Sequence, residues 1–482
     1  MKGFERKFPA LDIFSSERAA RLLEGTMRVL ETTGVRMEHS KGREVLHGAG
    51  CSVDAATNRV RIPRELVTKS FALCPRSFSV RARDPQNDIT IGGDRLYFVS
   101  GCGMNTLDID TRQVRPATRK ETLDGIRVLD SLDNLHLLLA FSPYFGWEGL
   151  APVMGEPEMT AAKARFSTKV QMTGSVNGSE IFAIKIAKAI GCEVLGLVNP
   201  TPPLTWYGDA VEALWRYCEA DVPFHISSGG CMGMTAPASI AGAVITTCAE
   251  LSAGIVLAQI LRPGARLWVG NFVTSANMLD GSIAFGSIAN SLTQAAFNEF
   301  WRPFGIPVWG AAPAYTSSKS IDFQCGVEKA MGAILAAVCG SHAVHMHGGV
   351  YAELTWHPVQ AILDDDIAGM VGRFLLGAGT ESEDLALDII DRVGPVPGHF
   401  LGEEHTLDRW ESLEYIPKAA DRLPLQQWKE QGRPDSVGLA MKRLKNILAQ
   451  HEPVPLGHAE DAAVDEILSE ARSHYRQKGQ LS

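Results

Sequence analysis

The sequence lacks several patterns that would identify common classes of protein. None of its nine cysteines belongs to a Cys-x-x-Cys pair, so neither a disulfide framework nor a zinc knuckle is indicated, and unpaired thiols fit a reducing compartment. The net charge of −9 argues against nucleic acid as the main partner. The opening residues, MKGFERKFPALDIF, contain no apolar signal-peptide core, so we expect a cytoplasmic protein.

One long uncharged stretch of the chain could be mistaken for a membrane span. Residues 236–261 are almost wholly uncharged, but Glu250 lies in their middle, serine and threonine recur along them, and Pro263-Gly264 follows them. A proline-glycine pair ends a helix, and an interior glutamate is costly in lipid. We therefore predict a buried helix of a globular protein and no membrane association.

Short apolar runs alternate with longer helical patterns from residue 96 onward. The eight runs are 96–99, 135–141, 169–173, 194–198, 223–227, 267–270, 307–309 and 343–347. Eight parallel strands with helices between them, in about 250 residues, are typical of a (β/α)8 TIM barrel of the α/β class. An open doubly wound sheet is the main alternative, but no G-x-G-x-x-G follows a first strand.

Two other regions flank the predicted barrel. Residues 1–95 combine short helical and strand patterns, which predict a small α/β layer. Residues 394–406 (GPVPGHFLGEEHT) are rich in glycine and proline, and helical patterns follow them. We expect an N-terminal α/β layer (1–95), a catalytic barrel (96–390) and a C-terminal connector with helices (391–482).

The active site of a TIM barrel lies at the carboxyl ends of its strands. These ends are rich in small and neutral hydrogen-bonding residues, and we find no carboxylate directly on them. After the last run, residues 345–357 read HMHGGVYAELTWH. His-x-His with Glu353 nearby is compatible with zinc, whereas the aromatic side chains suit an organic cation. Because too few hard ligands converge, we predict no metal.

Three long segments resemble the trimethylamine:corrinoid methyltransferase family. They are 229–270 (GGCMGMTAPASIAGAVITTCAELSAGIVLAQILRPGARLWVG), 317–344 (SSKSIDFQCGVEKAMGAILAAVCGSHAV) and 398–410 (GHFLGEEHTLDRW). The resemblance implies a (β/α)8 barrel that moves a methyl group from a methylated amine to the cobalt of a corrinoid (cobalamin). The corrinoid is carried by a small separate partner protein, so the resemblance implies no cofactor bound tightly by this chain.

The sequence departs from the archaeal members of that family at two positions. Those members carry pyrrolysine four residues before the lysine of a Ser/Asp-x-Lys motif; here the lysine is Lys319 and the corresponding position is Tyr315. They also carry a glutamate after the last strand, where alignment on Thr355-Trp356 places Tyr351. The chain thus resembles bacterial members without pyrrolysine, whose characterised examples act on quaternary amines such as glycine betaine, proline betaine or carnitine.

A quaternary ammonium needs no covalent activation, because it already carries a positive charge and leaves as a neutral amine. Such a site needs a dry cage of aromatic faces. A histidine could also hold a substrate carboxylate. We assign no catalytic residue, and the predicted substrate-binding residues are Tyr315, Tyr351, Trp356, His345, His347, Tyr97 and Tyr144.

Other polar residues receive structural interpretations. His345 and His347 are expected on the same face of a regular strand. His225 is interpreted as a hydrogen-bonded core residue, and the acidic run 364–366 as charge at a helix N-terminus. His357 is expected either to cap a helix or to support residues that line the pocket. Two other functions stay open: a metal-dependent barrel hydrolase that uses His345 and His347, and a non-catalytic binder of quaternary amines. We also expect a homo-oligomer.

Overall fold

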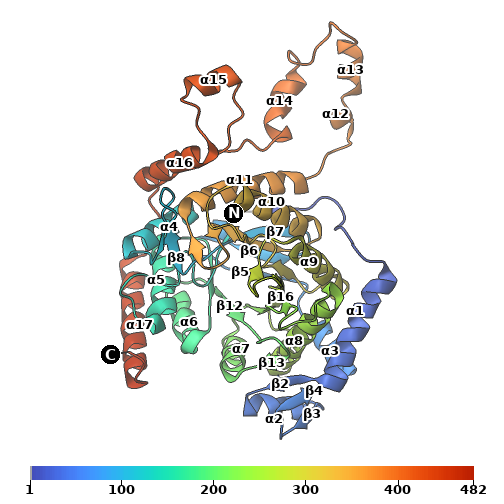
Figure 1. Ribbon diagram of the computed structural model, residues 1–482, viewed down its shortest axis with the longest axis vertical. Helices are drawn as coiled ribbons and strands as arrows, with labels where there is room; N and C mark the ends of the chain where they lie inside the picture. The colour runs from blue at the N-terminus through green and yellow to red at the C-terminus, as the bar shows by residue number, and fades with distance from the viewer. Residues whose placement is uncertain (1–2, 482) are drawn as a thin grey trace.

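The computed structural model describes residues 3–481 and confirms the (β/α)8 barrel expected from the sequence (Figure 1). Its eight parallel strands pair in chain order, and the last pairs with the first, so the sheet is closed. The strands are β7 (Arg95–Ser100), β10 (Leu137–Leu138), β11 (Val170–Thr173), β12 (Val194–Val198), β14 (Phe224–Ser228), β16 (Leu267–Asn271), β19 (Val308–Gly310) and β20 (Ala343–His347). Each of the eight predicted runs contains or overlaps one of them.

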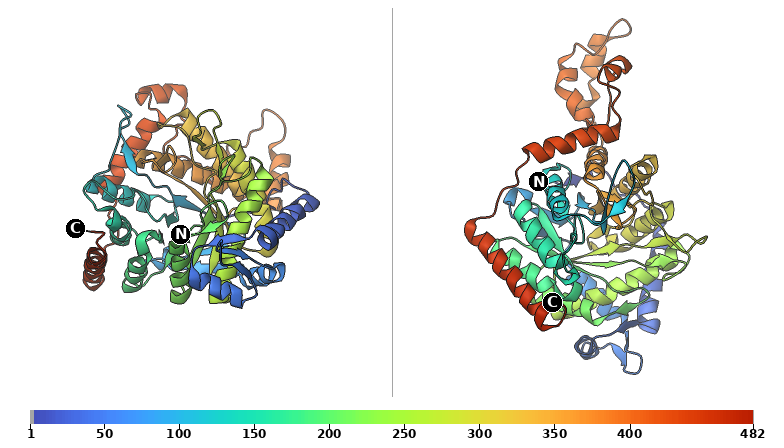
Figure 2. Two further views of the ribbon diagram at one scale, coloured as in Figure 1. Left: turned by 60° about the horizontal axis from the view of Figure 1, so that its bottom comes forward. Right: turned by 60° about the vertical axis from the view of Figure 1, so that its left-hand side comes forward.

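A helix follows every barrel strand and covers the outside of the sheet (Figure 2). The helices are α4 (Arg119–Ser131), α5 (Gly155–Phe166), α6 (Glu180–Ala189), α7 (Gly208–Ala220), α8 (Ile240–Leu261), α9 (Ile288–Trp301), α10 (Phe323–Val338) and α11 (Pro358–Leu375). Several begin at a side-chain cap; Thr118 and Glu121 form a reciprocal capping box at the start of α4. As predicted, His357 caps α11, its Nδ1 accepting a hydrogen bond from Val359 N at 3.1 Å.

The amino-terminal end of the barrel is closed by a hairpin. Strands β5 (Ser77–Val80) and β6 (Ile89–Gly92) pair antiparallel and lead directly into β7. Their apolar residues share one core cluster with the inward-facing residues of the barrel, among them Tyr97 and Trp268. The hairpin and these large side chains therefore fill the amino-terminal end of the barrel interior.

The uncharged stretch forms α8, which packs inside the protein against α1 (Ser16–Arg28) and α3 (Arg64–Leu73). Glu250 has a structural role: its carboxylate accepts a hydrogen bond from Leu204 N at 2.7 Å and another from the Ser228 hydroxyl at the end of β14. The helix has the length and hydropathy of a membrane span, but 72% of its apolar window is buried within the protein. It is therefore a core helix, as predicted.

Short sheets are added around the barrel. The helix α2 (Ser40–Gly48) and strands β2 (Val35–Met37), β3 (Ser52–Asp54), β4 (Arg59–Arg61) and β13 (Thr205–Trp206) form one layer, which packs on α8; β13 belongs to the loop that follows the carboxyl end of β12. The short strand β1 (Phe4–Glu5) pairs with the start of β7. At the carboxyl end, two sheets rise from the strand ends. They comprise β8 (Asn105–Leu107), β9 (Val114–Arg115), β21 (Gly349–Val350) and β22 (Thr355–Trp356), and β15 (Cys231–Met232), β17 (Thr274–Ala276) and β18 (Ile283–Ala284).

After α11 the chain leaves the barrel as an arm that projects away from it (Figures 1 and 2). The arm contains α12 (Ser382–Leu385), α13 (Leu387–Val393), α14 (Glu404–Leu413) and α15 (Leu425–Glu430). None of these four helices contains a buried residue. The chain then returns through α16 (Ser436–Gln450), which packs on α4 and α11, and α17 (His458–Gln477), which packs on α5 and α6.

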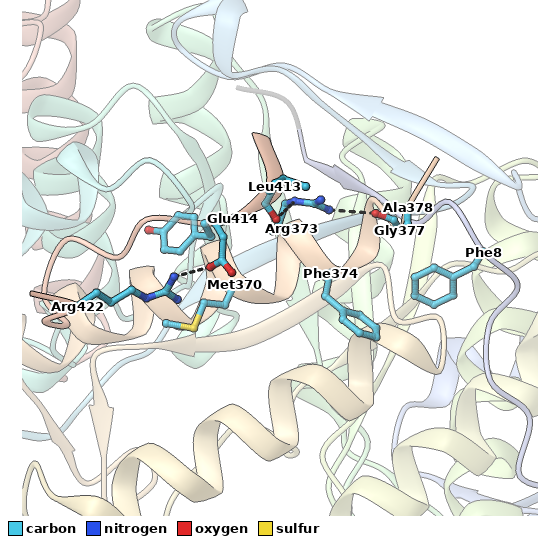
Figure 3. Close-up of a pocket in the computed structure, with 10 residues that line it drawn as sticks. Phe8, Met370, Arg373, Phe374, Gly377, Ala378, Leu413, Glu414 and Arg422 are labelled. Carbon is cyan, nitrogen blue, oxygen red and sulfur yellow. Dashed lines mark hydrogen bonds and ion pairs between the residues drawn. The ribbon is translucent and has the colours of Figure 1, made fainter. Parts of the chain in front are cut away.

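The base of the arm is fixed to the outer face of α11 around a hollow of about 550 Å³ (Figure 3). Arg373 donates hydrogen bonds to the carbonyl oxygens of Leu413 and Gly377, at 3.1 and 3.0 Å, and Glu414 pairs with Arg422. This hollow lies between α11 and the arm rather than at the strand ends. It is therefore not the site that the barrel fold itself provides.

The prediction that the acidic run 364–366 supplies charge at a helix N-terminus is wrong, because no acidic residue lies in the first turn of α11. All three carboxylates are buried, beyond the first turn of the helix, and anchor other segments. Asp364 Oδ2 accepts from Gly348 N at 2.8 Å and lies 2.9 Å from Lys329 Nζ. Asp365 accepts from Asn134 N at 2.9 Å, and Asp366 accepts from the Tyr415 hydroxyl at 3.0 Å. These bonds require burial, which the sequence pattern did not reveal.

Candidate functional site

A cavity of about 280 Å³ opens at the carboxyl ends of the barrel strands. That volume equals about nine water molecules at liquid density, so it suits a small ligand. Among residues 3–481, no lysine or arginine side chain lines it. Its aromatic lining residues are Phe141, Phe145, Phe272 and Trp309, and its polar ones include Asn199, His225, Ser227, His345 and Glu353.

The aromatic walls come from three different strand ends. Phe141 follows β10 and stacks on Phe145, with ring centroids 4.6 Å apart. Phe272 follows β16 and meets the ring of Tyr315 edge-on at 5.4 Å. Trp309 lies in β19. Aromatic faces in a dry pocket attract organic cations through the ring quadrupole, so these walls favour an alkylated ammonium group.

The wall formed by the end of β10 is held by the buried side-chain amine of Lys163. Lys163 of α5 donates hydrogen bonds to the carbonyl oxygens of Leu139 (2.9 Å) and Ala140 (2.5 Å), two residues that line the cavity. Burial lowers the pKa of Lys163 to about 8, while the charge of Glu156 acts in the opposite direction. Burial likewise raises the pKa of Glu156 to about 7, opposed by Lys163. This pair fixes the β10 end without presenting charge to the cavity.

Glu353 places a carboxyl group at the mouth of the cavity. Its Oε1 accepts a hydrogen bond of 2.7 Å from the Tyr315 hydroxyl, whose oxygen lies 2.9 Å from His345 Nδ1. Burial raises the pKa of Glu353, and the bond from Tyr315 acts against that rise. Burial, reinforced by the positive charge of Lys329, lowers the pKa of His345 to about 3, so this imidazole is neutral at physiological pH. A carboxyl group thus faces aromatic walls and a neutral histidine.

The turn that presents Glu353 is conformationally strained. It joins β21 to β22, and its residues Tyr351 and Ala352 have φ angles of 52° and 57°, in the left-handed region that L-residues rarely adopt. Ala352 N donates to Thr316 O at 3.0 Å, which fixes the turn to the loop after β19. The statement that the strand ends carry no carboxylate was therefore incomplete, because this hairpin folds Glu353 back over the opening.

His225 lines the cavity from β14, and the structure contradicts its interpretation as a hydrogen-bonded core residue. Within the described chain neither ring nitrogen has a hydrogen-bond partner. Its ring centroid lies 4.2 Å from that of Trp309, and a Cβ on Gly270 would lie 2.1 Å from its Nε2. Burial lowers the pKa of His225 well below its ordinary value, and His345 adds to the effect, so this ring is also neutral.

His345 and His347 do not share a face, contrary to the expectation for a regular strand. The register against β7 shifts between them: His345 lies opposite Val99 and His347 opposite Ser100, so Met346 is an extra residue. Such a bulge reverses the facing of the residues that follow. His345 lines the cavity, whereas His347 lies 3.8 Å from Asp365 Oδ1 of α11 in the helix layer.

The other predicted binding residues lie around the cavity rather than on its walls. The Tyr97 hydroxyl bonds to Thr90 of the hairpin at the opposite end of the barrel. Tyr144 and Trp356 pack edge-on at 5.3 Å beneath the rim, inside the core cluster of α4 and α11. Tyr351 makes a cation–π contact with Lys319, whose Nζ lies 4.5 Å from the centroid of the Tyr351 ring. Tyr315 stands behind the wall and contacts it through Glu353 and His345.

The aromatic residues that do line the cavity were accessible to sequence reasoning only in part. Phe141 and Trp309 end two of the predicted strand runs, and Phe272 follows a third closely. The predicted aromatic residues were chosen because they lie at or near strand ends, but whether a ring enters the barrel also depends on which face of the strand carries it, and that alternates from residue to residue. Among residues 3–481, no group of three His, Cys, Asp or Glu side chains is arranged to hold a metal ion.

Comparison with known proteins gives one family. A family model described as trimethylamine methyltransferase (MTTB) matches residues 1–142 and 154–474. A glycine betaine methyltransferase of Desulfitobacterium hafniense (strain Y51) is 28% identical over 485 aligned residues, covering 96% of this chain and 97% of that protein. The trimethylamine methyltransferase MttB of Methanosarcina barkeri is 26% identical over 466 residues, covering 92% of each.

Solved structures agree on the fold. The crystal structure of the monomethylamine methyltransferase (MtmB) of Methanosarcina barkeri superposes with a TM-score of 0.51. The match covers 95% of this chain and 92% of that one, at 11% sequence identity. At that identity the likeness concerns the arrangement of the barrel and its flanking layers, and the residues of the cavity must be interpreted from their own chemistry.

Proposed function

Because this chain belongs to the trimethylamine methyltransferase family, it is a methyltransferase, and we propose that its substrate is a small quaternary amine such as glycine betaine, proline betaine or carnitine. The proposed acceptor is the Co(I) atom of a corrinoid (cobalamin) carried by a separate small protein. This chain would bind no cofactor tightly itself. We also propose that it forms a homo-oligomer in the cytoplasm.

The reaction is a displacement at a methyl carbon. The carbon–nitrogen bond breaks with its electron pair remaining on nitrogen, so the ammonium leaves as a neutral tertiary amine. The electron pair of Co(I) forms the new bond to the methyl carbon. No proton has to move, which fits a site whose histidine His345 is neutral. The role of the protein is then to hold the cation in line for attack and to exclude water.

The observation that carries this proposal is the combination of aromatic walls and one carboxyl group in a cavity without a lining cation. A quaternary ammonium has no N–H to donate, so ring faces and a nearby negative charge are the groups that attract it. An unprotonated, neutral amine would gain little from either. The cavity therefore suits a quaternary ammonium.

The direct test is a methyl-transfer assay with free cob(I)alamin or a corrinoid protein as acceptor. We expect formation of methylcobalamin from at least one of glycine betaine, proline betaine and carnitine, and none from trimethylamine, because Tyr315 stands where archaeal relatives carry the activating residue. The absorbance change on Co(I) methylation measures the rate. Turnover of trimethylamine without turnover of any betaine would contradict the proposal.

Binding of the cation should depend on the protonation of Glu353. Burial raises the pKa of this carboxyl group above its ordinary value, so it gains a proton, and loses its charge, at a higher pH than an exposed glutamate. We expect affinity for the substrate to be constant at high pH and to fall as the pH drops through that raised pKa. Calorimetric titration across the acidic range, with Glu353→Gln as the control, measures this. If the affinity of Glu353→Gln falls at low pH as that of the wild type does, the pH dependence comes from a group other than Glu353.

A further inference from the structure

Three nitrogen atoms at the inner part of the cavity, two on His225 and one on Trp309, have no hydrogen-bond partner within the described chain. These two residues are 1% and 2% exposed. The Trp309 indole can only donate, and a neutral His225 has one N–H to donate. Buried donors are almost always satisfied in folded proteins, because leaving one unpaired is costly. Two such groups side by side, 4.2 Å between ring centroids, therefore require a reason.

The cavity is polarised along the barrel axis. His225 and Trp309 lie within strands β14 and β19, whereas Phe141 and Phe272 follow strand ends and Glu353 comes from a rim hairpin. Groups that can donate to an anion thus lie at the inner end. The carboxyl group and aromatic faces that attract a cation lie toward the opening. A ligand that matches both ends carries an acceptor at one end and an ammonium at the other.

We propose that His225, with the indole N–H of Trp309 beside it, forms a subsite for the carboxylate of a zwitterionic substrate. The proposal rests on the function proposed above and adds an orientation to it. The carboxylate enters first and accepts hydrogen bonds at the inner end. The N-methyl groups then face the opening, the side from which a cobalt atom on a separate protein would approach.

The close approach of β16 supports this role for His225. Gly270 has no side chain, and a Cβ there would lie 2.1 Å from His225 Nε2 and 2.8 Å from Ser227 Oγ. The absence of a side chain at that position leaves the space that the imidazole uses inside the barrel. Asn199 also lines the cavity, and its amide Nδ2 uses one of its two N–H groups to donate to Ser227 O at 3.0 Å.

The test compares two cations that differ in the carboxylate. Glycine betaine and tetramethylammonium share the methylated nitrogen, and only the first has an acceptor for His225. We expect His225→Leu to weaken the binding of glycine betaine by about 30-fold and to leave tetramethylammonium unchanged, both measured by calorimetry. His225→Gln retains an N–H donor and should recover part of the preference.

Thermal unfolding separates this role from a structural one. Because the imidazole makes no hydrogen bond within the protein, its replacement by leucine should leave the melting temperature unchanged or raise it. A variant that binds both cations as the wild type does, or loses both equally, would overturn the subsite. A wild-type protein that binds tetramethylammonium but not glycine betaine would also overturn it. A wild-type protein that binds neither would overturn the proposed function itself, and the subsite with it.

Discussion

Replacing Glu353 with glutamine is expected to weaken the binding of a quaternary ammonium substrate by about 100-fold. Removing one partner of a desolvated charge pair costs about 2–5 kcal/mol, and each 1.4 kcal/mol is a factor of ten in affinity. The substitution preserves shape, because the amide oxygen can still accept the 2.7 Å bond from Tyr315. The fold should therefore be intact, and the change in affinity should come from the lost charge alone.

The kinetic constants should show which state Glu353 stabilises. The substrate loses its positive charge as the methyl group leaves, so a nearby carboxylate stabilises the bound substrate more than the transition state. We expect KM to rise and kcat to stay equal or increase. Glu404→Gln on the exposed helix α14 makes the same charge change far from the cavity and serves as the control. Unchanged affinity in the Glu353 variant would mean that the ammonium binds elsewhere.

Replacing Asp364 with alanine should lower the free energy of unfolding by about 3–5 kcal/mol. Asp364 and Lys329 form an ion pair at 2.9 Å, and their side chains are 0% and 1% exposed. Removing one member leaves a buried ammonium without a counter-charge, which is the costly case for buried pairs. Gly348 N would also lose its acceptor. Urea denaturation measures the change, and Asp388→Ala on the exposed helix α13 is the matched control.

A second variant identifies the cause. Replacing both partners, Asp364→Leu with Lys329→Met, removes the charges together and should recover much of the lost stability, because an apolar pair of similar volume is often neutral. Lys329 also donates to Met346 O (2.8 Å) and Gly349 O (2.7 Å), and these oxygens and Gly348 N stay unpaired in the double variant, so its recovery should be incomplete. A loss below about 1 kcal/mol in the single variant would contradict the argument.

The sequence was sufficient to predict the barrel because each strand is a short apolar run. The runs at 194–198 and 267–270 differ from β12 and β16 by no more than one residue at an end. Burial on both faces gives such a signal, and it does not depend on distant contacts. The position of His357 before Pro358 was predictable for the same reason, since a helix cap is determined by neighbouring residues.

The cavity was less predictable because its members depend on contacts between distant segments. Glu353 reaches the opening only because Tyr351 and Ala352 adopt left-handed backbone angles, a feature that neither residue type indicates. Tyr315 and His345 were each predicted to bind substrate, but the hydrogen bond by which the Tyr315 hydroxyl supports Glu353 joins residues 38 positions apart in the chain. The acidic residues of α11 similarly required a tertiary structure to show what they hold.

Met346 decides what kind of chemistry this end of the barrel can host. Side chains along a strand point alternately to its two faces, and one inserted residue reverses the face for every residue after it. Here the inserted residue lies between two histidines, so that His345 lines the cavity and His347 faces the helix layer. In a regular strand without this insertion, His347 would point into the barrel beside His345, on the side of the cavity where Glu353 lies. Two imidazoles and a carboxylate are the ligand set of many catalytic zinc ions. A single unit of chain length thus separates a pocket for an organic cation from the beginnings of a metal centre.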